Sequence, residues 1–478
     1  MCLLKNKLRF LIIPLLFIIA TGSMGWWFYY DPTASFTISL PGMDHRGKAL
    51  TGKPDNINIG EFFSFKKTGE GLPGTRWPRF RGGDFDNISK ETIPLIDSWG
   101  KNGPRILWKI PLGEGHAAPA IYDGRVYLLD YDETLRQDAL RCFSLATGEE
   151  LWRRSYQLRL KRNHGLSRTI PSINEKYVVT IGPRCQVMCT DRLTGQLFWG
   201  IDLVRDFNAE VPFWYTGQCP LIDQDTVILA PCGKSLLVAV NCNTGKTIWE
   251  TPNTRKWKMS HSSVMPMTYK GQKMYVYCAI GGICGIAASG PARGKILWET
   301  AAFSPSVVAP SPVILDQGRI FITAGYGAGS ALLQLNETKD RFYATVVQKY
   351  KPPEGLASEQ QTPILVNGYL YSIQPKDAGA LHNQFVSCSP DNGKKIIMTS
   401  GKTTRFGLGP YIYADEKFFI LNDDGEMTIA KVSGSGFEEL DQAHIIDGQD
   451  SWGPLAIAGG YLLMRDSKTL ICLDIRKK

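Results

Sequence analysis

The sequence predicts an all-β fold of repeated antiparallel hairpins, and two independent marks along the chain lead to this prediction. The first mark is a tight turn followed by a tryptophan, seen in residues 236–249, where Asn243 and Gly245 separate two short alternating apolar segments. Glycine can adopt the positive φ with which such a turn reverses the chain. The tryptophans that end these repeats are spaced 47, 50 and 49 residues apart: Trp152, Trp199, Trp249 and Trp298. A period of this length indicates a repeat architecture.

The second mark is a proline that opens an apolar hairpin, such as the one turning at Asp123 and Gly124. Proline cannot donate to a sheet ladder, so each is expected at a sheet edge or at the start of a strand. The spacing is 44 to 52 residues, and the prolines are Pro119, Pro171, Pro220, Pro266, Pro312, Pro363, Pro410 and Pro454. Two hairpins per period give four strands in roughly 48 residues, which predicts an eight-bladed β-propeller of four-stranded antiparallel blades.

The two ends of this repeat region are each incomplete. Residues 106–108 resemble an outer strand without inner partners, and residues 470–474 resemble a third strand after which the chain stops. A ring left open would expose two strand edges, so residues 106–110 are expected to pair beside residues 471–475 and close it. In the later units the turn signal weakens, and residues 332–343, 386–397 and 427–440 carry no tryptophan at the repeat position.

The N-terminus reads as an export segment. Lys5, Lys7 and Arg9 precede an apolar run, and residues 8–30 are 23 residues long with an aromatic cluster at their end. This length suffices to cross a bilayer, and the basic residues place the N-terminus in the cytoplasm. A cleaved signal peptide, cut near Ala20, is the alternative. The predicted organisation is a signal anchor (transmembrane helix) or signal peptide in 1–30, a tether in 31–75 and the propeller in 76–478, on the exported, periplasmic side of the inner membrane.

Charge and cysteine content narrow the function classes. The net charge is +9, and no nucleic-acid motif occurs, so a nucleic-acid partner is not expected. The densest basic run lies within residues 153–168 and reads either as a face for an anionic partner or as a solvated loop between blades. Cys142, Cys189 and Cys472 share one strand position with Ala239 and Ala288, so these thiols are interpreted as small core side chains rather than as disulfide partners. No zinc-like spacing of cysteine and histidine occurs, so no metal site of that kind is expected.

The repeat Ala-X-Asp-X-X-Thr-Gly-X-X-X-Trp resembles that of the PQQ-like, or quinoprotein-type, β-propellers. Thr244 and Gly245 with Trp249, and Asp191 with Trp199, carry the match. The opening Trp77-Pro-Arg-Phe-Arg-Gly-Gly resembles an exported bacterial subfamily. The resemblance implies that Trp152, Trp199, Trp249 and Trp298 are structural and dock neighbouring blades, and it does not fix an activity.

Two function classes follow from this resemblance. The first is a non-catalytic scaffold that binds an exported or membrane protein, similar to the propeller lipoprotein of the outer-membrane β-barrel assembly machinery; it implies no cofactor. The second is a PQQ-dependent alcohol or sugar dehydrogenase, which implies PQQ with calcium. Those enzymes are longer and carry adjacent cysteines beside the cofactor, whereas no two cysteines are adjacent here. No catalytic residue is therefore assigned.

A candidate ligand site follows from the proline marks, because residues just before them begin the innermost strands and surround the mouth of the central channel. Convergent polar groups around a concavity indicate a binding site. Alternatively, such groups bind one another and channel water. The candidates are His116, Arg168, Gln218, His261, Gln361 and Trp452.

The tryptophan repeat generates a stability prediction. If Trp249 is buried between blades, Trp249→Ala is expected to lower the free energy of unfolding by about 3–5 kcal/mol, the range for removing a large buried aromatic side chain. Denaturant unfolding of the purified protein measures the change.

Overall fold

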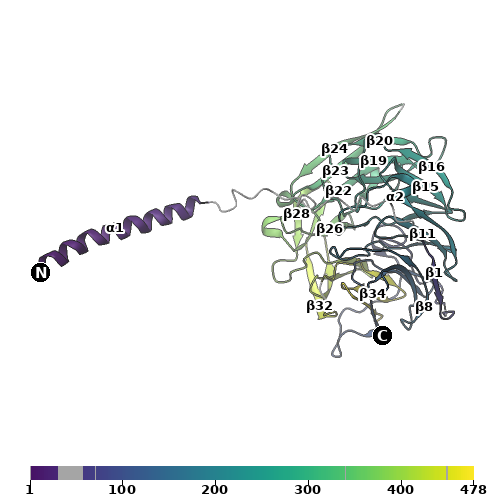
Figure 1. The fold of residues 1–478 in the computed structure, drawn as a ribbon, viewed down its shortest axis with the longest axis horizontal. Coiled ribbons are helices and arrows are strands. Elements are labelled where there is room, and N and C mark those ends of the chain that lie inside the picture. The colour runs from purple at the N-terminus through teal and green to yellow at the C-terminus, as the bar shows by residue number, and fades with distance from the viewer. Residues whose placement is uncertain (1, 31–56, 70, 340, 448–449, 478) are drawn as a thin grey trace. The chain divides into compact units, whose positions relative to one another are not determined.

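The computed structural model describes residues 2–30, 57–69, 71–339, 341–447 and 450–477 (Figure 1). Residues 1–52 and 53–478 form separate compact units. In the first unit α1 (Cys2–Tyr29) is one helix of 28 residues with Pro14 inside it, so nearly all of the predicted export segment is helical. Among the described helices, none combines the length and the apolar run that crossing a membrane requires.

The second unit contains eight sheets that follow one another around a ring in chain order (Figure 1). In each blade the first strand starts within two residues of a predicted proline mark and lies nearest the central channel, and the fourth strand lies outermost. Two blades carry additional strands from residues 62–89. The predicted eight-bladed propeller of four-stranded antiparallel blades is confirmed.

Blade 1 consists of β5 (Ala120–Tyr122), β6 (Arg125–Asp132), β7 (Gln137–Ser144) and β8 (Glu150–Gln157). Blade 2 consists of β9 (Ser172–Ile173), β10 (Tyr177–Ile181), β11 (Gln186–Asp191) and β12 (Leu197–Asp202). Blade 3 consists of β13 (Leu221–Asp223), β14 (Thr226–Leu229), β15 (Ser235–Asn241) and β16 (Thr247–Pro252), and blade 4 of β17 (Met265–Tyr269), β18 (Gln272–Ala279), β19 (Gly282–Ala287) and β20 (Ile296–Thr300). Blade 5 consists of β21 (Val313–Ile314), β22 (Arg319–Ala324), β23 (Gly329–Glu337) and β24 (Phe342–Tyr350). Blade 6 consists of β25 (Ile364–Val366), β26 (Tyr369–Ile373), β27 (Phe385–Ser389) and β28 (Asn392–Thr399). Blade 7 consists of β29 (Tyr411–Ala414), β30 (Lys417–Leu421), β31 (Glu426–Val432) and β32 (Phe437–His444), and blade 8 of β33 (Ala456–Ala458), β34 (Tyr461–Arg465), β35 (Thr469–Asp474) and β4 (Ile106–Pro111). The connections include α2 (Leu203–Phe207) and the 3-10 turns η1 (Asp316–Gly318), η2 (Pro352–Glu354) and η3 (Gly379–Leu381).

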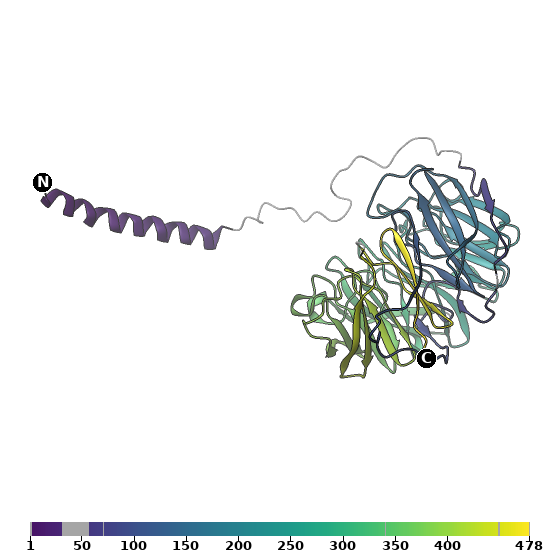
Figure 2. The same ribbon diagram turned by 90° about the horizontal axis from the view of Figure 1, so that it is seen from below.

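The ring closes by pairing its first and last strands. β4 lies antiparallel to β35, with Ile110 opposite Leu470 and Ile106 opposite Leu473. The eighth blade therefore takes three strands from the C-terminus and one from residues 106–111. In Figure 1 the yellow C-terminal strands lie beside the dark blue first blade, and Figure 2 shows the same neighbours from below. The predicted closure is confirmed.

The segment before the ring is bound to it earlier than the sequence suggests. β1 (Phe62–Phe65) pairs with β8 at the outer edge of blade 1, with Phe63 opposite Arg154. The Arg154 guanidinium lies 4.3 Å from the Phe63 ring centroid and donates to the Gly60 carbonyl at 2.8 Å. The prediction of a tether reaching residue 75 is therefore wrong at its C-terminal end, and its part from residue 31 to residue 56 lies outside the described residues.

Neighbouring blades are joined by tryptophan rings that lie on the turn glycines of the next blade. Trp152 of blade 1 covers Gly195 of blade 2, and the same contact joins Trp108 to Gly148, Trp199 to Gly245, and Trp249 to Gly294. A Cβ atom at any of these glycines would come within 2.7–2.9 Å of the indole, and each glycine has a positive φ. Both constraints require glycine. Trp152, Trp199 and Trp249, three of the four tryptophans to which the resemblance gives a docking role, make this contact.

Trp298 packs differently because blade 5 has no turn glycine at the equivalent position. Its indole lies against Gly285 of its own blade, and Nε1 is 3.3 Å from the Met274 sulfur. The ring is 3 % exposed and belongs to the core shared by blades 4 and 5. Trp298 therefore still packs between blades, without the glycine contact.

Each described third-to-fourth strand pair contains a β-bulge beside this tryptophan position. In blade 1 the register shifts between Cys142 and Phe143, directly after the pair Cys142 and Trp152. The same shift occurs in all eight blades. A bulge bends its strand and redirects a side chain, so it sets the tryptophan toward the next blade.

The cysteines behave as small core residues. The ten cysteines between Cys142 and Cys472 are unpaired and buried. Cys142, Cys189 and Cys472 lie opposite tryptophans, as Ala239 does in blade 3. In blade 4 the residue opposite the tryptophan is Gly285, so the predicted equivalence of Ala288 is wrong.

Burial separates two tryptophans that the sequence could not rank. Trp152 is 1 % exposed, whereas Trp249 is only half-buried. Trp152→Ala is therefore expected to lower the free energy of unfolding by about 3–5 kcal/mol, and Trp249→Ala by less than that, which corrects the prediction made above. Denaturant unfolding of both variants measures the two losses of unfolding free energy, provided that the dependence of the free energy on denaturant concentration has the same slope in both. An equal or larger loss for Trp249→Ala contradicts the prediction.

Candidate functional site

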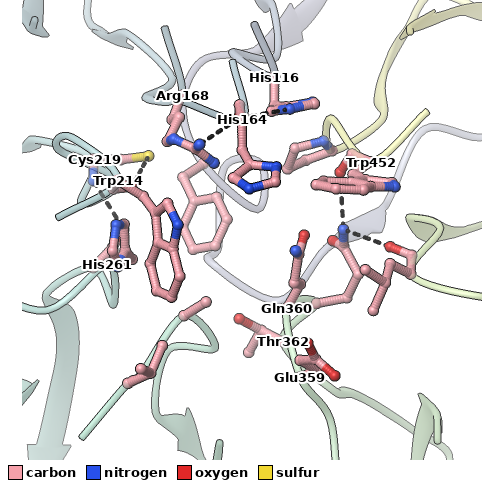
Figure 3. Close-up of a pocket in the computed structure, with 18 of the residues that line it drawn as sticks. His116, His164, Arg168, Trp214, Cys219, His261, Glu359, Gln360, Thr362 and Trp452 are labelled. Atoms are coloured by element: carbon pink, nitrogen blue, oxygen red, sulfur yellow. Dashed lines mark hydrogen bonds between the residues drawn. The ribbon is translucent and has the colours of Figure 1, made fainter. Parts of the chain in front are cut away.

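The central channel contains a cavity of about 340 Å³. The connections between blades place its lining side chains there, since each runs inward to the next innermost strand (Figure 3). The lining residues are Phe80, His116, His164, Arg168, Ile170, Trp214, Gly217, Cys219, His261, Ser263, Val307, Ala309, Tyr326, Glu359, Gln360, Gln361, Thr362, Lys376, Leu408, Trp452 and Pro454.

A chain of hydrogen bonds between blades holds the inner strands at this level. The backbone N–H of Ile170 donates to the Cys219 sulfur at 3.3 Å, and that of Cys219 donates to Ser263 Oγ at 3.0 Å. The chain continues from Ser263 to Ser311 at 2.8 Å and from Ser311 to Thr362 at 2.9 Å. It thus links blades 2 to 6 and fixes the cavity wall without using strand pairing.

The segment around Phe80 closes the channel beneath the cavity. β2 (Arg76–Trp77) pairs with the innermost strand of blade 1, and β3 (Ile88–Ser89) pairs with that of blade 7. Between them, Pro78 accepts from the Ile173 N–H at 2.9 Å in blade 2, and Arg79 donates to the Ile222 carbonyl at 3.3 Å in blade 3. Phe80 itself lines the cavity.

Arg81 anchors the far side of this segment. Its guanidinium is buried and donates to the carbonyls of Thr362 at 2.9 Å and Pro363 at 3.0 Å in blade 6. Burial lowers the pKa of Arg81 to about 10. We define residues 76–89 as the channel segment. It crosses the channel and contacts the innermost strands of several blades.

Five of the six candidate residues line the cavity, namely His116, Arg168, His261, Gln361 and Trp452. Gln218 does not. Its side chain is buried and exchanges two hydrogen bonds with the backbone of Ala230, at 2.7 and 3.1 Å. Side chains alternate along an extended chain, so Gly217 and Cys219, on either side of it, face the cavity instead. A Cβ at residue 217 would lie 2.4 Å from His261 Cδ2, which explains the glycine there.

Arg168 is the dominant charge at the cavity. All three of its hydrogen bonds leave from Nη2 and end on the carbonyls of Asn163, His164 and Gly165. Burial lowers the pKa of Arg168 to about 10. Of the carboxylates in the described part of the chain, none lies within ion-pair distance of it. The guanidinium is thus positioned by backbone dipoles and lines the cavity without an ion pair to any described carboxylate.

Two further arginines of the predicted basic run form ion pairs, whereas Arg159 and Lys161 are exposed. Arg153 pairs with Glu150 at 2.9 Å, and Arg162 pairs with Glu114 at 2.6 Å. These contacts neutralise side chains that the sequence offered as a continuous basic face.

Two neutral histidines flank Arg168. Burial, with the positive charges of Arg168 and Arg465, lowers the pKa of His116 to about 3. Burial and Arg168 lower the pKa of His261 to about 4. His116 donates from Nε2 to the His164 carbonyl at 3.2 Å, which leaves Nδ1 buried and without a hydrogen-bond partner among the described residues.

Aromatic rings form two walls of the cavity. His116 stacks on Trp452 at 4.9 Å between centroids, and Trp214 stacks on Tyr326 at 6.1 Å. Gln361 donates to the Trp452 carbonyl at 3.0 Å and fixes the first wall. Sequence reasoning missed Trp214, which lies six residues before Pro220, and Tyr326, which lies in the turn between β22 and β23.

Glu359 lies on the other side of the cavity from Arg168 (Figure 3), and Lys376 also lines the cavity. Neither residue was predicted from the sequence. The Lys376 Nζ is 4.0 Å from Glu359 Oε1. Burial raises the pKa of Glu359. Glu359 stands four residues before Pro363, so its proximity to a proline mark was the signal that could have found it.

The lining residues do not fit PQQ with calcium, the cofactor that the quinoprotein resemblance implies for an enzyme. Calcium takes six to eight oxygen ligands, mostly carboxylates and carbonyls. Glu359 is the one carboxylate among the lining residues. Across the described residues no group of three or more metal-binding side chains comes together. We therefore derive no step through this cofactor.

The two cavity histidines generate a prediction about acid stability. Each is neutral in the fold, and its unfolded form takes up a proton below pH ~6.5, so each contributes about 2 kcal/mol of instability at pH 5 and almost none at pH 7. The double variant His116→Gln/His261→Gln should therefore lose less stability than the native chain between pH 7 and pH 5. Denaturant unfolding at both pH values measures the difference. The surface variant His382→Gln is the control, and an equal loss in all three proteins contradicts the prediction.

Comparison with known proteins agrees with this fold. A family model described as outer membrane protein assembly factor BamB matches residues 136–396, more than half of the chain. No curated protein matches in sequence. The crystal structure of BamB from Moraxella catarrhalis is similar over 78 % of this chain and 99 % of that chain, with 13 % identity and a TM-score of 0.51. A europium-containing methanol dehydrogenase is similar over 83 % and 89 %, with 12 % identity and a TM-score of 0.53. At such identities the structures share a fold only, and the family model decides the relationship: the chain belongs to the BamB family of PQQ-like β-propellers.

Proposed function

We propose that this protein is a non-catalytic scaffold that binds a protein partner through one face of the propeller. The observation that carries the proposal is the match of the BamB family model to residues 136–396, which span most of blades 1 to 6. The tryptophan and glycine contacts make the ring rigid, and a rigid ring with loops at its ends is suited to presenting a binding surface.

The face at the cavity mouth is the one that we assign to the partner. We call it the cavity face; it contains the connections between blades and the turns between second and third strands. Phe213 lies there, 46 % exposed, with its ring 5.4 Å from that of Trp214. Exposed aromatic side chains are enriched at protein interfaces. The opposite face contains the turns between third and fourth strands, which are occupied by the contacts between blades.

Anchoring at the inner membrane, with the propeller on the periplasmic side, is part of the proposal. Lys5, Lys7 and Arg9 before the apolar run that begins at Phe10 support it. Replacing residues 1–30 by a cleavable signal should move the protein from the membrane fraction to the soluble periplasmic fraction.

Site-specific crosslinking in intact cells tests the partner. A photoreactive residue at Phe213 is expected to give a discrete crosslinked protein, and the same residue at Leu193 is expected to give none. Leu193 is a matched control, since it is 48 % exposed and lies in the turn between β11 and β12 on the opposite face.

Equal crosslinking at both positions, or none at either, contradicts the assignment of the cavity face. The alternative function is a PQQ-dependent dehydrogenase. If the purified chain reduces a dye only when PQQ and calcium are added, the dehydrogenase function replaces the scaffold function.

A further inference from the structure

Arg168 has no counter-ion among the described residues, although its position at the cavity would stabilise a bound anion. Its guanidinium lines the cavity, its hydrogen bonds end on neutral carbonyls, and within the described residues no carboxylate pairs with it. The neighbouring imidazoles of His116 and His261 are neutral and supply no negative charge. The Arg168 side chain is half-buried. A charge drawn partly out of water without a partner is costly, and an anion in the cavity would reduce that cost.

The cavity has the size and closure of a small-molecule site. Its volume of about 340 Å³ falls in the range of ligand pockets. The channel segment bounds it at Phe80, so a ligand enters from the cavity face. This volume is far larger than an inorganic anion needs, and apolar side chains, among them Val307, Ala309 and Leu408, line much of it.

The aromatic walls specify a flat, apolar body. The stacked pairs His116 with Trp452 and Trp214 with Tyr326 present ring faces at the cavity. Aromatic rings prefer offset-stacked or edge-to-face neighbours at 4.5–7 Å between centroids. The tilted Trp214 and His261 rings, 6.1 Å apart, continue this wall toward Arg168.

We propose that the central cavity binds a small aromatic carboxylate, with the carboxylate at Arg168 and the ring between the aromatic side chains. A carboxylate pairs strongly with a guanidinium, and one negative charge balances the one unpaired cation. The Lys376 and Glu359 pair adds no net charge. The proposal is independent of the protein partner, because it concerns the purified chain alone.

Calorimetric titration of the purified full-length chain with benzoate tests this site, with benzamide as the uncharged ligand of the same shape. Benzoate is expected to bind at least tenfold more tightly than benzamide. Arg168→Met should weaken benzoate binding at least tenfold and leave benzamide binding unchanged. Arg255→Met is the matched control, since Arg255 forms an exposed ion pair with Glu299 and is remote from the lining.

Arg168→Lys distinguishes two roles of Arg168, namely its positive charge and its hydrogen bonds to the loop of residues 163–165. If the charge binds the ligand, the lysine variant should recover part of the benzoate affinity lost in Arg168→Met. A second readout follows from the histidines. Burial, and after it the charge of Arg168, lowers the pKa of His116 and His261. A bound anion offsets the second cause, so binding should take up protons below pH 6, seen as a buffer-dependent heat. Absence of benzoate binding at millimolar concentration, equal affinity for benzamide, or equal affinity in Arg168→Met would each overturn the proposal.

Discussion

The fold depends on the contact between a tryptophan ring and the turn glycine of the next blade. Each sheet alone has two apolar faces and exposed edges, so a blade becomes stable only when it is packed between neighbours. The indole covers the glycine so closely that a Cβ atom would collide with it, as for Trp152 on Gly195. The β-bulge beside each tryptophan position sets this direction. Side-chain packing, strand irregularity and turn conformation therefore act as one unit at each of these junctions.

This unit weakens around the ring, and other contacts replace it. Blade 5 lacks the turn glycine, and the Trp298 indole lies against Gly285 of its own blade while it still packs between blades 4 and 5. In blade 5, Gln348 stands at the tryptophan position, and Tyr350, two residues later, lies against Gly393 of blade 6. The channel segment reaches this weaker half through Arg81 and β3, which bind blades 6 and 7. It thus stabilises the blades that have lost the tryptophan.

The fold was largely predictable because its signals are local and periodic. A turn glycine, a proline and a tryptophan recur in every early blade, and each has one physical reason for its position. The cavity was predictable in part, since the proline marks locate the innermost strands and gave His116, Arg168, His261, Gln361 and Trp452. Gln218 failed because one residue of register decides which side chain faces the channel. Trp214, Tyr326 and Lys376 could not be found, because they lie in loops without periodicity. The docking of β1 onto blade 1 could not be found either, because it depends on tertiary strand pairing that leaves no sequence signal.

The way the ring closes has a consequence for its biogenesis. β4 is synthesised early, yet its partner β35 lies more than 350 residues later in the chain. Until the last residues emerge, β4 remains an unpaired apolar strand edge, and such edges recruit other chains. Contacts of this sequence separation also form slowly. The protein therefore passes through a long interval in which nearly all of its blades exist but the ring is open, and protection during this interval falls to whatever binds nascent chains in its compartment.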